Sequence, residues 1–108
     1  MIEVTVWKAK DQYRGFLFRG HAGYREEGED ILCAAVSALA LNTANSIEAF
    51  TDDYFEQELS EDGGYLRMSF TRDVSEATSL LMNSLLLGIQ NIQAEYGMEY
   101  ITLTFEEV

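Results

Sequence analysis

The sequence predicts an α+β fold, a mostly antiparallel sheet of about five strands carrying two long helices in the order ββαββαβ. Five short runs are rich in β-favouring residues or alternate between apolar and polar ones. Two longer runs rich in Ala and Leu exceed the usual length of a strand. A chain of 108 residues forms one hydrophobic core, so we expect a single domain over residues 1–108.

The first half of the chain reads as a hairpin followed by a helix. Residues 2–10 alternate, with Ile2, Val4 and Val6 on one face. After the short connection "DQY", the run "RGFLFRGH" predicts the second strand, which ends at His21. Residues 31–50 contain neither glycine nor proline and predict a long helix.

The second half of the chain also predicts a hairpin followed by a helix, and then a last strand. "YFEQELS" and "YLRMSFT" flank "EDGG", whose residues suit a hairpin turn. Residues 74–96 predict a helix with Asp73 and Glu76 as a capping box and Gly97 as the C-cap. The run "EYITLTFEE" predicts the fifth strand. The expected buried stripe of this helix is Ala77, Leu81, Leu85, Ile89, Ile92 and Tyr96.

The charge balance bears on possible partners. Nineteen Asp and Glu against seven Lys and Arg give a formal net charge of −12. Such a field repels phosphate backbones and anionic lipids, so we expect no direct nucleic acid and no membrane as partners. It would attract a basic peptide, although acidity for solubility alone explains the composition equally well.

The cysteine count and the N-terminus indicate a cytoplasmic protein. The single cysteine cannot form an internal disulfide, and the first residues alternate like a strand instead of resembling a signal peptide. The most apolar stretches, residues 31–41 and 80–89, are shorter than a membrane span requires. We therefore expect no transmembrane helix.

The only histidine and the only cysteine, His21 and Cys33, lie twelve positions apart. With Asp30 as N-cap, Cys33 would occupy the first turn of the helix, where free N–H groups and the helix dipole favour a thiolate. The glycine-bounded segment between them would turn the chain back and bring the two side chains together. This geometry fits a nucleophile and its general base.

Ordinary structural roles explain the same residues. A lone cysteine in an alanine-rich helix is usually a small buried hydrophobe, and a lone histidine at a strand end is usually a polar surface residue. Ser37 lies one turn after Cys33 and either supports the thiolate or bonds within its own helix. One Cys and one His supply only two good zinc ligands, so we expect no metal and no cofactor.

The stretch "GHAGY…G.DILCAAVSAL", residues 20–39, resembles the signature of the ribosomal-processing cysteine protease (Prp, or YsxB-like) family. The length and the element order agree with that family over the whole chain. A Gly-His pair, a glycine-bounded loop and Asp-x-x-Cys-Ala-Ala-Val-Ser together form a specific motif.

The resemblance implies a cysteine endopeptidase that removes the N-terminal extension of a large-subunit ribosomal protein, the twenty-seventh in that subunit's naming. Its nucleophile would be Cys33 and its general base His21, with Gly20, Asp30 and Ser37 in support. It also implies a homodimer and a loop that becomes ordered around substrate. That loop corresponds here to Ala22, Gly23, Tyr24, Arg25, Glu26, Glu27, Gly28 and Glu29.

Two other functions remain open from the sequence. A non-catalytic ribosome-associated peptide-binding or assembly factor would use the same groove without cleaving its ligand. A thiol redox switch would use Cys33 as its sensor. Peptide turnover under reducing conditions would distinguish the protease from both.

Overall fold

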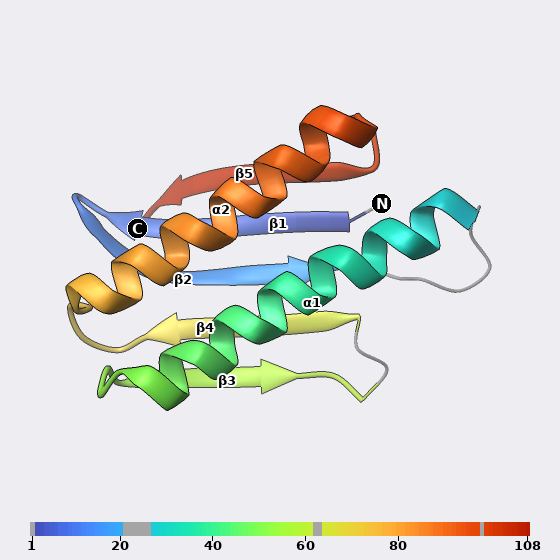
Figure 1. The fold of residues 1–108 in the computed structure, drawn as a ribbon. Helices are drawn as coiled ribbons and strands as arrows, with labels where there is room; N and C mark the ends of the chain where they lie inside the picture. Colours follow the sequence, from blue (N-terminus) through green and yellow to red (C-terminus); the bar gives the residue numbers. More distant parts are fainter. Residues whose placement is uncertain (1, 21–26, 62–63, 98) are drawn as a thin grey trace.

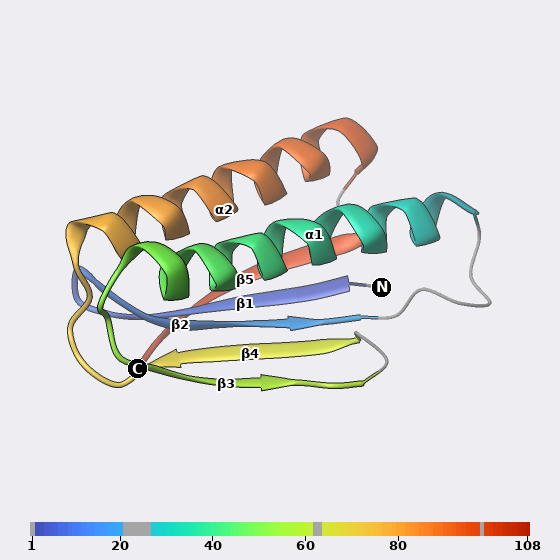
Figure 2. The same cartoon turned by 60° about the horizontal axis from the view of Figure 1, so that its bottom comes forward.

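Two helices lie side by side on one face of a five-stranded sheet (Figures 1 and 2). The computed structural model describes residues 2–20, 27–61, 64–97 and 99–108. The element order confirms the predicted ββαββαβ arrangement. The elements are β1 (Ile2–Ala9), β2 (Gln12–Arg19), α1 (Glu27–Phe50), β3 (Phe55–Leu59), β4 (Tyr65–Phe70), α2 (Glu76–Tyr96) and β5 (Ile101–Glu107).

The strands have the spatial order β3-β4-β2-β1-β5. Three neighbouring pairs are antiparallel, β1 with β2, β2 with β4, and β3 with β4. The fifth strand pairs in parallel with β1, because α2 carries the chain across the sheet before β5 begins (Figure 1). The sheet is therefore mixed but mostly antiparallel, as predicted.

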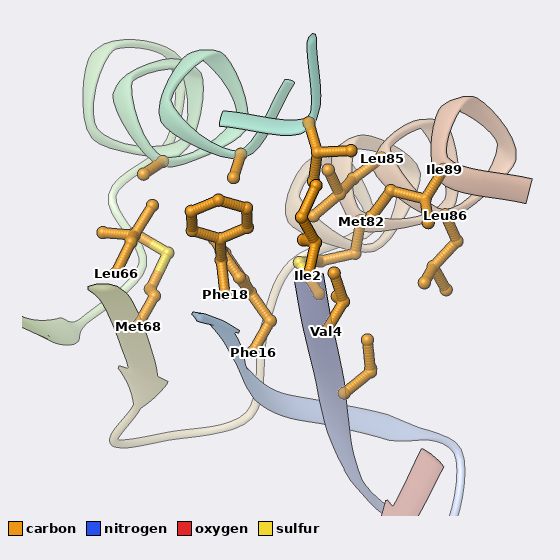
Figure 3. Close-up of a cluster of buried hydrophobic side chains, with 14 of the residues drawn as sticks. Ile2, Val4, Phe16, Phe18, Leu66, Met68, Met82, Leu85, Leu86 and Ile89 are labelled. Atoms are coloured by element: carbon orange, nitrogen blue, oxygen red, sulfur yellow. The ribbon is translucent and has the colours of Figure 1, made fainter. Parts of the chain in front are cut away.

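The core lies between the sheet and the two helices (Figure 3). Its centre is β2, where Phe16 and Phe18 are almost completely buried. Phe16 pairs with Val6 on β1 and with Met68 on β4, so all three strands turn apolar side chains toward the helices. The alternation seen in the sequence thus separates a buried face of the sheet from an open one.

The start of α2 differs from the prediction. Its N-cap is Ser75, whose side chain accepts a hydrogen bond from the Thr78 N–H at 3.2 Å, and the helix begins at Glu76. Asp73 instead pairs with Arg14 of β2, with 2.8 Å between the guanidinium and the carboxylate. The predicted cap at Asp73 is wrong because its side chain bonds to a distant strand. The C-cap at Gly97 is confirmed, with φ of 98° and its N–H donating to the Gln93 carbonyl at 2.8 Å.

The buried face of α2 is also rotated from the predicted stripe. Ala77 and Tyr96 are exposed, whereas the polar residues Thr78 and Gln93 are buried. Gln93 donates from Nε2 to the Ile101 carbonyl at 3.0 Å, and Thr78 donates to Asp53. Hydrogen bonds to distant residues allow these side chains to occupy core positions, which an apolar pattern alone does not reveal. The buried residues are Thr78, Met82, Leu85, Leu86, Ile89 and Gln93.

One helical segment, Ile31–Phe50, is long and apolar enough to cross a membrane by length and composition. In this fold the segment packs on the sheet through buried residues such as Val36, Ala40 and Ile47. The core helix of a soluble protein can have the same length and apolar composition. Its composition therefore agrees with its place as a core helix.

Candidate active site

Cys33 lies in the first half of α1 and belongs to the hydrophobic core. Only 6% of its surface is exposed, and its neighbours Leu32 and Val36 are also buried. The first part of α1, which contains Cys33, lies at the end of the molecule where β2 also ends (Figure 1). A buried position shields the thiol from bulk water, so a reacting partner must approach along a restricted path.

The helix around Cys33 begins earlier than predicted. Its first residue is Glu27, so Asp30 lies inside the helix and Cys33 is its seventh residue. The predicted N-cap at Asp30 is therefore wrong, and the predicted loop is shorter because Glu27, Gly28 and Glu29 are helical. Acidic residue types are favourable in a first helical turn.

This earlier start changes the electrostatics predicted for the thiol. The backbone N–H groups that lack helical partners belong to the first turn. With a rise of 1.5 Å per residue, the centre of that turn lies about 6 Å along the helix axis from Cys33. The effect of the helix dipole also declines beyond that turn. The helix terminus therefore stabilises a thiolate at Cys33 less than predicted.

Gly20 follows the last residue of β2 and precedes His21. Its N–H donates to the Gly64 carbonyl at 3.0 Å, which ties the end of β2 to the β3–β4 connection. The sequence marked Gly64 only as a turn residue, and no local signal indicated this contact. His21 and the loop residues Ala22, Gly23, Tyr24, Arg25 and Glu26 lie outside the described residues. The contact between His21 and Cys33 stays a prediction.

Ser37 lies one helical turn after Cys33 on the same flank of α1 and is half-buried. Leu39, on the other flank, contacts Gly88 of α2 closely enough that a methyl group at Gly88 would lie 3.0 Å from it. The flank with Cys33 and Ser37 therefore faces away from α2. This arrangement places that flank on the side of α1 opposite the contact with α2.

Two surface depressions lie on the open face of the sheet, away from Cys33. Trp7, Arg67 and Ser69 line one of about 360 Å³, and Glu58 faces Arg67 in the other. The guanidinium of Arg67 stacks over the Trp7 ring at 5.5 Å and pairs with Glu58 at 3.4 Å. Arg67 is thus held between Trp7 and Glu58, and the thiol lies elsewhere, so we do not place the candidate active site on this face.

A search of the described residues for a metal site finds no group of three or more His, Cys, Asp or Glu side chains that could hold an ion. Cys33 is the only thiol in the sequence, and a thiol is the nucleophile from which a cysteine-dependent enzyme would be built.

Comparison with known proteins identifies the class more closely. A family model described as "Cysteine protease Prp" matches residues 1–102. The chain is 29% identical over 105 residues to the ribosomal processing cysteine protease Prp of Staphylococcus aureus (strain Mu50), which covers 97% of both chains. The class is thus that of cysteine proteases.

Solved structures agree with this assignment over the whole chain. The crystal structure of SMU.848 from Streptococcus mutans is 33% identical, with a TM-score of 0.86, covering 100% of this chain and 99% of that one. The essential ribosomal processing protease Prp from S. aureus, in complex with a covalently linked product peptide, is 26% identical with a TM-score of 0.85. That match covers 98% of this chain and 100% of the other. The chain belongs to the Prp family of cysteine proteases.

Proposed function

We propose that this protein is an endopeptidase that removes the N-terminal extension of the twenty-seventh large-subunit ribosomal protein through a His21–Cys33 dyad. Its relative in S. aureus is named a ribosomal processing protease, and the family motif matches at both positions. The processing would serve ribosome assembly, in the cytoplasm, with the enzyme acting as a homodimer.

The observation that carries this proposal is the position of the single thiol. Cys33 is the only cysteine of the chain, it is buried, and it lies on the flank of α1 that faces away from α2. The related S. aureus protease has been crystallised with a covalently linked product peptide. A covalent intermediate on this chain would require a nucleophile, and Cys33 is the residue suited to the role.

The proposed chemistry follows from the two side chains. His21 accepts the thiol proton, and Sγ of Cys33 attacks the scissile carbonyl carbon. The C–N bond breaks as His21 returns the proton to the leaving amine. Water then adds to the thioester and gives its proton to His21, and Cys33 leaves as the thiol when the acid product is released. Backbone N–H groups would stabilise the oxyanion.

Replacing Cys33 tests the proposal directly. In Cys33→Ser and His21→Ala, cleavage of a peptide copying the ribosomal-protein extension should fall by at least about 1,000-fold in kcat/KM. Mass spectrometry of the wild type should detect a peptide adduct on the protein, which Cys33→Ser should lose. Because the chain has one cysteine, the adduct reports on that position alone.

Ala49→Ser is the matched control, since it adds the same hydroxyl to an exposed position near the other end of α1. It should cleave at the wild-type rate. Cleavage that survives in either Cys33→Ser or His21→Ala would refute the dyad. Peptide binding without turnover or adduct would instead favour the peptide-binding assembly factor.

A further inference from the structure

The strand β3 forms one edge of the sheet (Figures 1 and 2). Within the described residues it pairs with β4 on one side and with no strand on the other, and its five residues are exposed or half-buried. The backbone N–H and C=O groups along the outer side of such a strand can pair with another chain. An extended peptide can therefore add to the sheet at β3.

The pairing with β4 identifies the backbone groups that point outward. Ser60 donates its N–H to the Tyr65 carbonyl at 3.0 Å, and Thr71 donates its N–H to the Tyr54 carbonyl at 3.1 Å. Pairs that exchange hydrogen bonds alternate with pairs that do not along an antiparallel ladder. The N–H and C=O groups that point to the outer edge therefore belong to the alternate residues of the strand, Phe55, Gln57 and Leu59.

The side chains of β3 give its two faces different chemistry. Glu56 and Glu58 lie on the open face of the sheet, where Glu58 is opposite Arg67 of β4. On the face toward the helices, Leu59 is opposite the buried Leu66, yet 53% of its own surface is exposed. An added strand would thus meet carboxylates on one face and an apolar side chain on the other.

The open-face side of this edge already holds two cations of the chain itself. Glu58 pairs with the Arg67 guanidinium at 3.4 Å, and Arg72 stacks over the ring of Tyr54, just before the strand, at 4.0 Å. Glu56 lies between them in sequence and is exposed, and it forms no ion pair within the described part of the chain. The edge therefore favours guanidinium groups and has a carboxylate available for another cation.

The sequence around β3 also favours a basic occupant over a second copy of the strand. Residues 48–62 contain seven Asp and Glu and no Lys or Arg. Like charges directly opposite each other destabilise a strand pair, so two copies of β3 repel each other edge to edge. The same carboxylates attract Lys and Arg of a different strand. Charge complementarity thus selects an extended basic segment.

We propose that the outer edge of β3 binds an extended basic segment of the substrate protein as an added strand. The inference rests on the proposed protease function and adds a substrate contact outside the residues that react at Cys33. Lys or Arg side chains of the segment face Glu56 and Glu58, and its alternate apolar side chains face Leu59. Backbone hydrogen bonds supply affinity, and the alternating side chains supply the preference for this edge.

One substrate chain can reach both the edge and the candidate active site. Leu59 of β3 pairs with Leu66 of β4, which pairs with Phe18 of β2, so an added strand lies three strand spacings, about 14 Å, from β2. The hydrogen bond from the Gly20 N–H to the Gly64 carbonyl holds this end of the sheet together. About five extended residues span that distance. The segment on β3 is therefore distinct from the residues that are cleaved but continuous with them.

A binding assay tests the edge without cleavage. The probe is a fluorescein-labelled peptide of eight alternating Lys and Val residues, and its fluorescence anisotropy is followed as wild-type protein is added. Gln57→Pro removes an outward N–H and keeps the hydrogen bonds to β4, while Glu56→Lys reverses the charge. Each should raise the Kd of the probe by at least about tenfold. A peptide of alternating Glu and Val should not bind.

Each variant has a matched control, and circular dichroism checks that all of them are folded. Gln57→Ala shortens the same side chain but keeps its backbone N–H. Glu95→Lys makes the same charge reversal at an exposed position in the last turn of α2, on the opposite side of the molecule from β3 (Figures 1 and 2). Both controls should bind the probe within about twofold of the wild-type Kd.

Cleavage kinetics test the link to the protease function. The two substrates are the complete ribosomal protein and a short peptide limited to the residues next to the scissile bond. Gln57→Pro and Glu56→Lys should raise KM for the complete protein by at least about tenfold, with kcat unchanged, and should cleave the short peptide like the wild type. A merely structural role would impair both substrates equally.

The outcomes separate this inference from the protease function. Folded variants at Gln57 and Glu56 that bind the probe like the wild type would overturn the inference, as would equal losses on the two substrates. Wild type that cleaves both substrates but does not bind the probe would overturn the inference alone. Wild type that binds the probe through β3 but cleaves neither substrate would refute the protease function and leave β3 as a site for basic peptides.

Discussion

Gly15 in β2 occupies a position where a side chain would collide with the next strand. Its φ is 150°, and a Cβ atom built there would lie 2.2 Å from the Met68 carbonyl oxygen. The register between β1 and β2 shifts at Trp7 and Lys8, immediately beside Gly15. The pairing of β2 with β4 continues at this point, because Gly15 pairs with Ser69.

Gly15→Ala should therefore reduce the free energy of unfolding by about 2–4 kcal/mol, measured by urea denaturation. The added methyl group forces the backbone of β4 to move, because Met68 belongs to that strand. Gly15 lies on β2 and Cys33 on α1, so cleavage at low temperature should be retained if the variant folds.

Gly88→Ala is the variant to compare with Gly15→Ala. Its added methyl would meet only the flexible end of Leu39, at 3.0 Å, and alanine favours the helix by about 1 kcal/mol. Its stability should remain within about 1 kcal/mol of the wild type. Equal losses in the two variants would contradict the account of Gly15.

At the scale of elements, the connection before β3 stabilises the start of α2. The Asp53 carboxylate accepts hydrogen bonds from the Ser75 N–H at 3.0 Å and from the Ser75 hydroxyl at 2.6 Å, and it also accepts from the Thr78 hydroxyl. Partial burial would raise the pKa of Asp53, but these hydrogen bonds outweigh burial and hold its pKa below the usual value. The carboxylate thus joins the end of α1 to the beginning of α2.

Asp53→Asn should lower the free energy of unfolding by about 1–2 kcal/mol at neutral pH, since it removes a charged acceptor at a helix N-terminus. The folded pKa lies below the unfolded value of about 3.9, so this contribution is present above about pH 5 and is lost as pH falls through the folded pKa. Denaturation of wild type and variant between neutral and acidic pH should show the two stabilities converging in acid.

Asp52→Asn provides the control, because Asp52 is the residue next to Asp53 and is exposed. That substitution should change stability by less than about 0.5 kcal/mol at either pH. A difference between Asp53→Asn and the wild type that persists unchanged in acid would contradict the assigned role of the carboxylate.

At the scale of the whole molecule, the net charge of −12 favours a basic substrate segment. If encounter with the ribosomal-protein extension is electrostatically steered, kcat/KM should fall by about threefold or more between low salt and 0.5 M salt. The measurement compares the extension peptide with a version whose Lys and Arg residues are replaced by Gln. The neutral peptide should show little salt dependence, and a salt-independent rate for both would refute steering.

Much of the fold follows from local patterns that the sequence displays. The alternation of Ile2, Val4 and Val6 identified the buried face of β1, and the "EDGG" stretch marked the β3–β4 hairpin. Gly97 ended α2 as predicted, since a positive φ at a helix end favours glycine. These signals are local, because each depends on the alternation of apolar residues along one segment or on the backbone conformation of one residue.

Other features depend on contacts between different elements of the fold. The N-cap of α2 is Ser75 and not Asp73, because Arg14 of a distant strand pairs with Asp73. Thr78 and Gln93 are buried because Asp53 and the Ile101 carbonyl satisfy them. A hydrophobic pattern cannot identify such positions, since their burial depends on partners that only folding brings near.

For the candidate site, the sequence by itself determined the residue types and their spacing, with a single cysteine, and the chain matches the protease family over residues 1–102. The tertiary structure decided that Cys33 is buried in the second turn of α1, on the flank facing away from α2. The physical reason is that residue types and their spacing are properties of the chain alone. How the helices pack on the sheet decides which side chains are buried and which face of a helix contacts its neighbour.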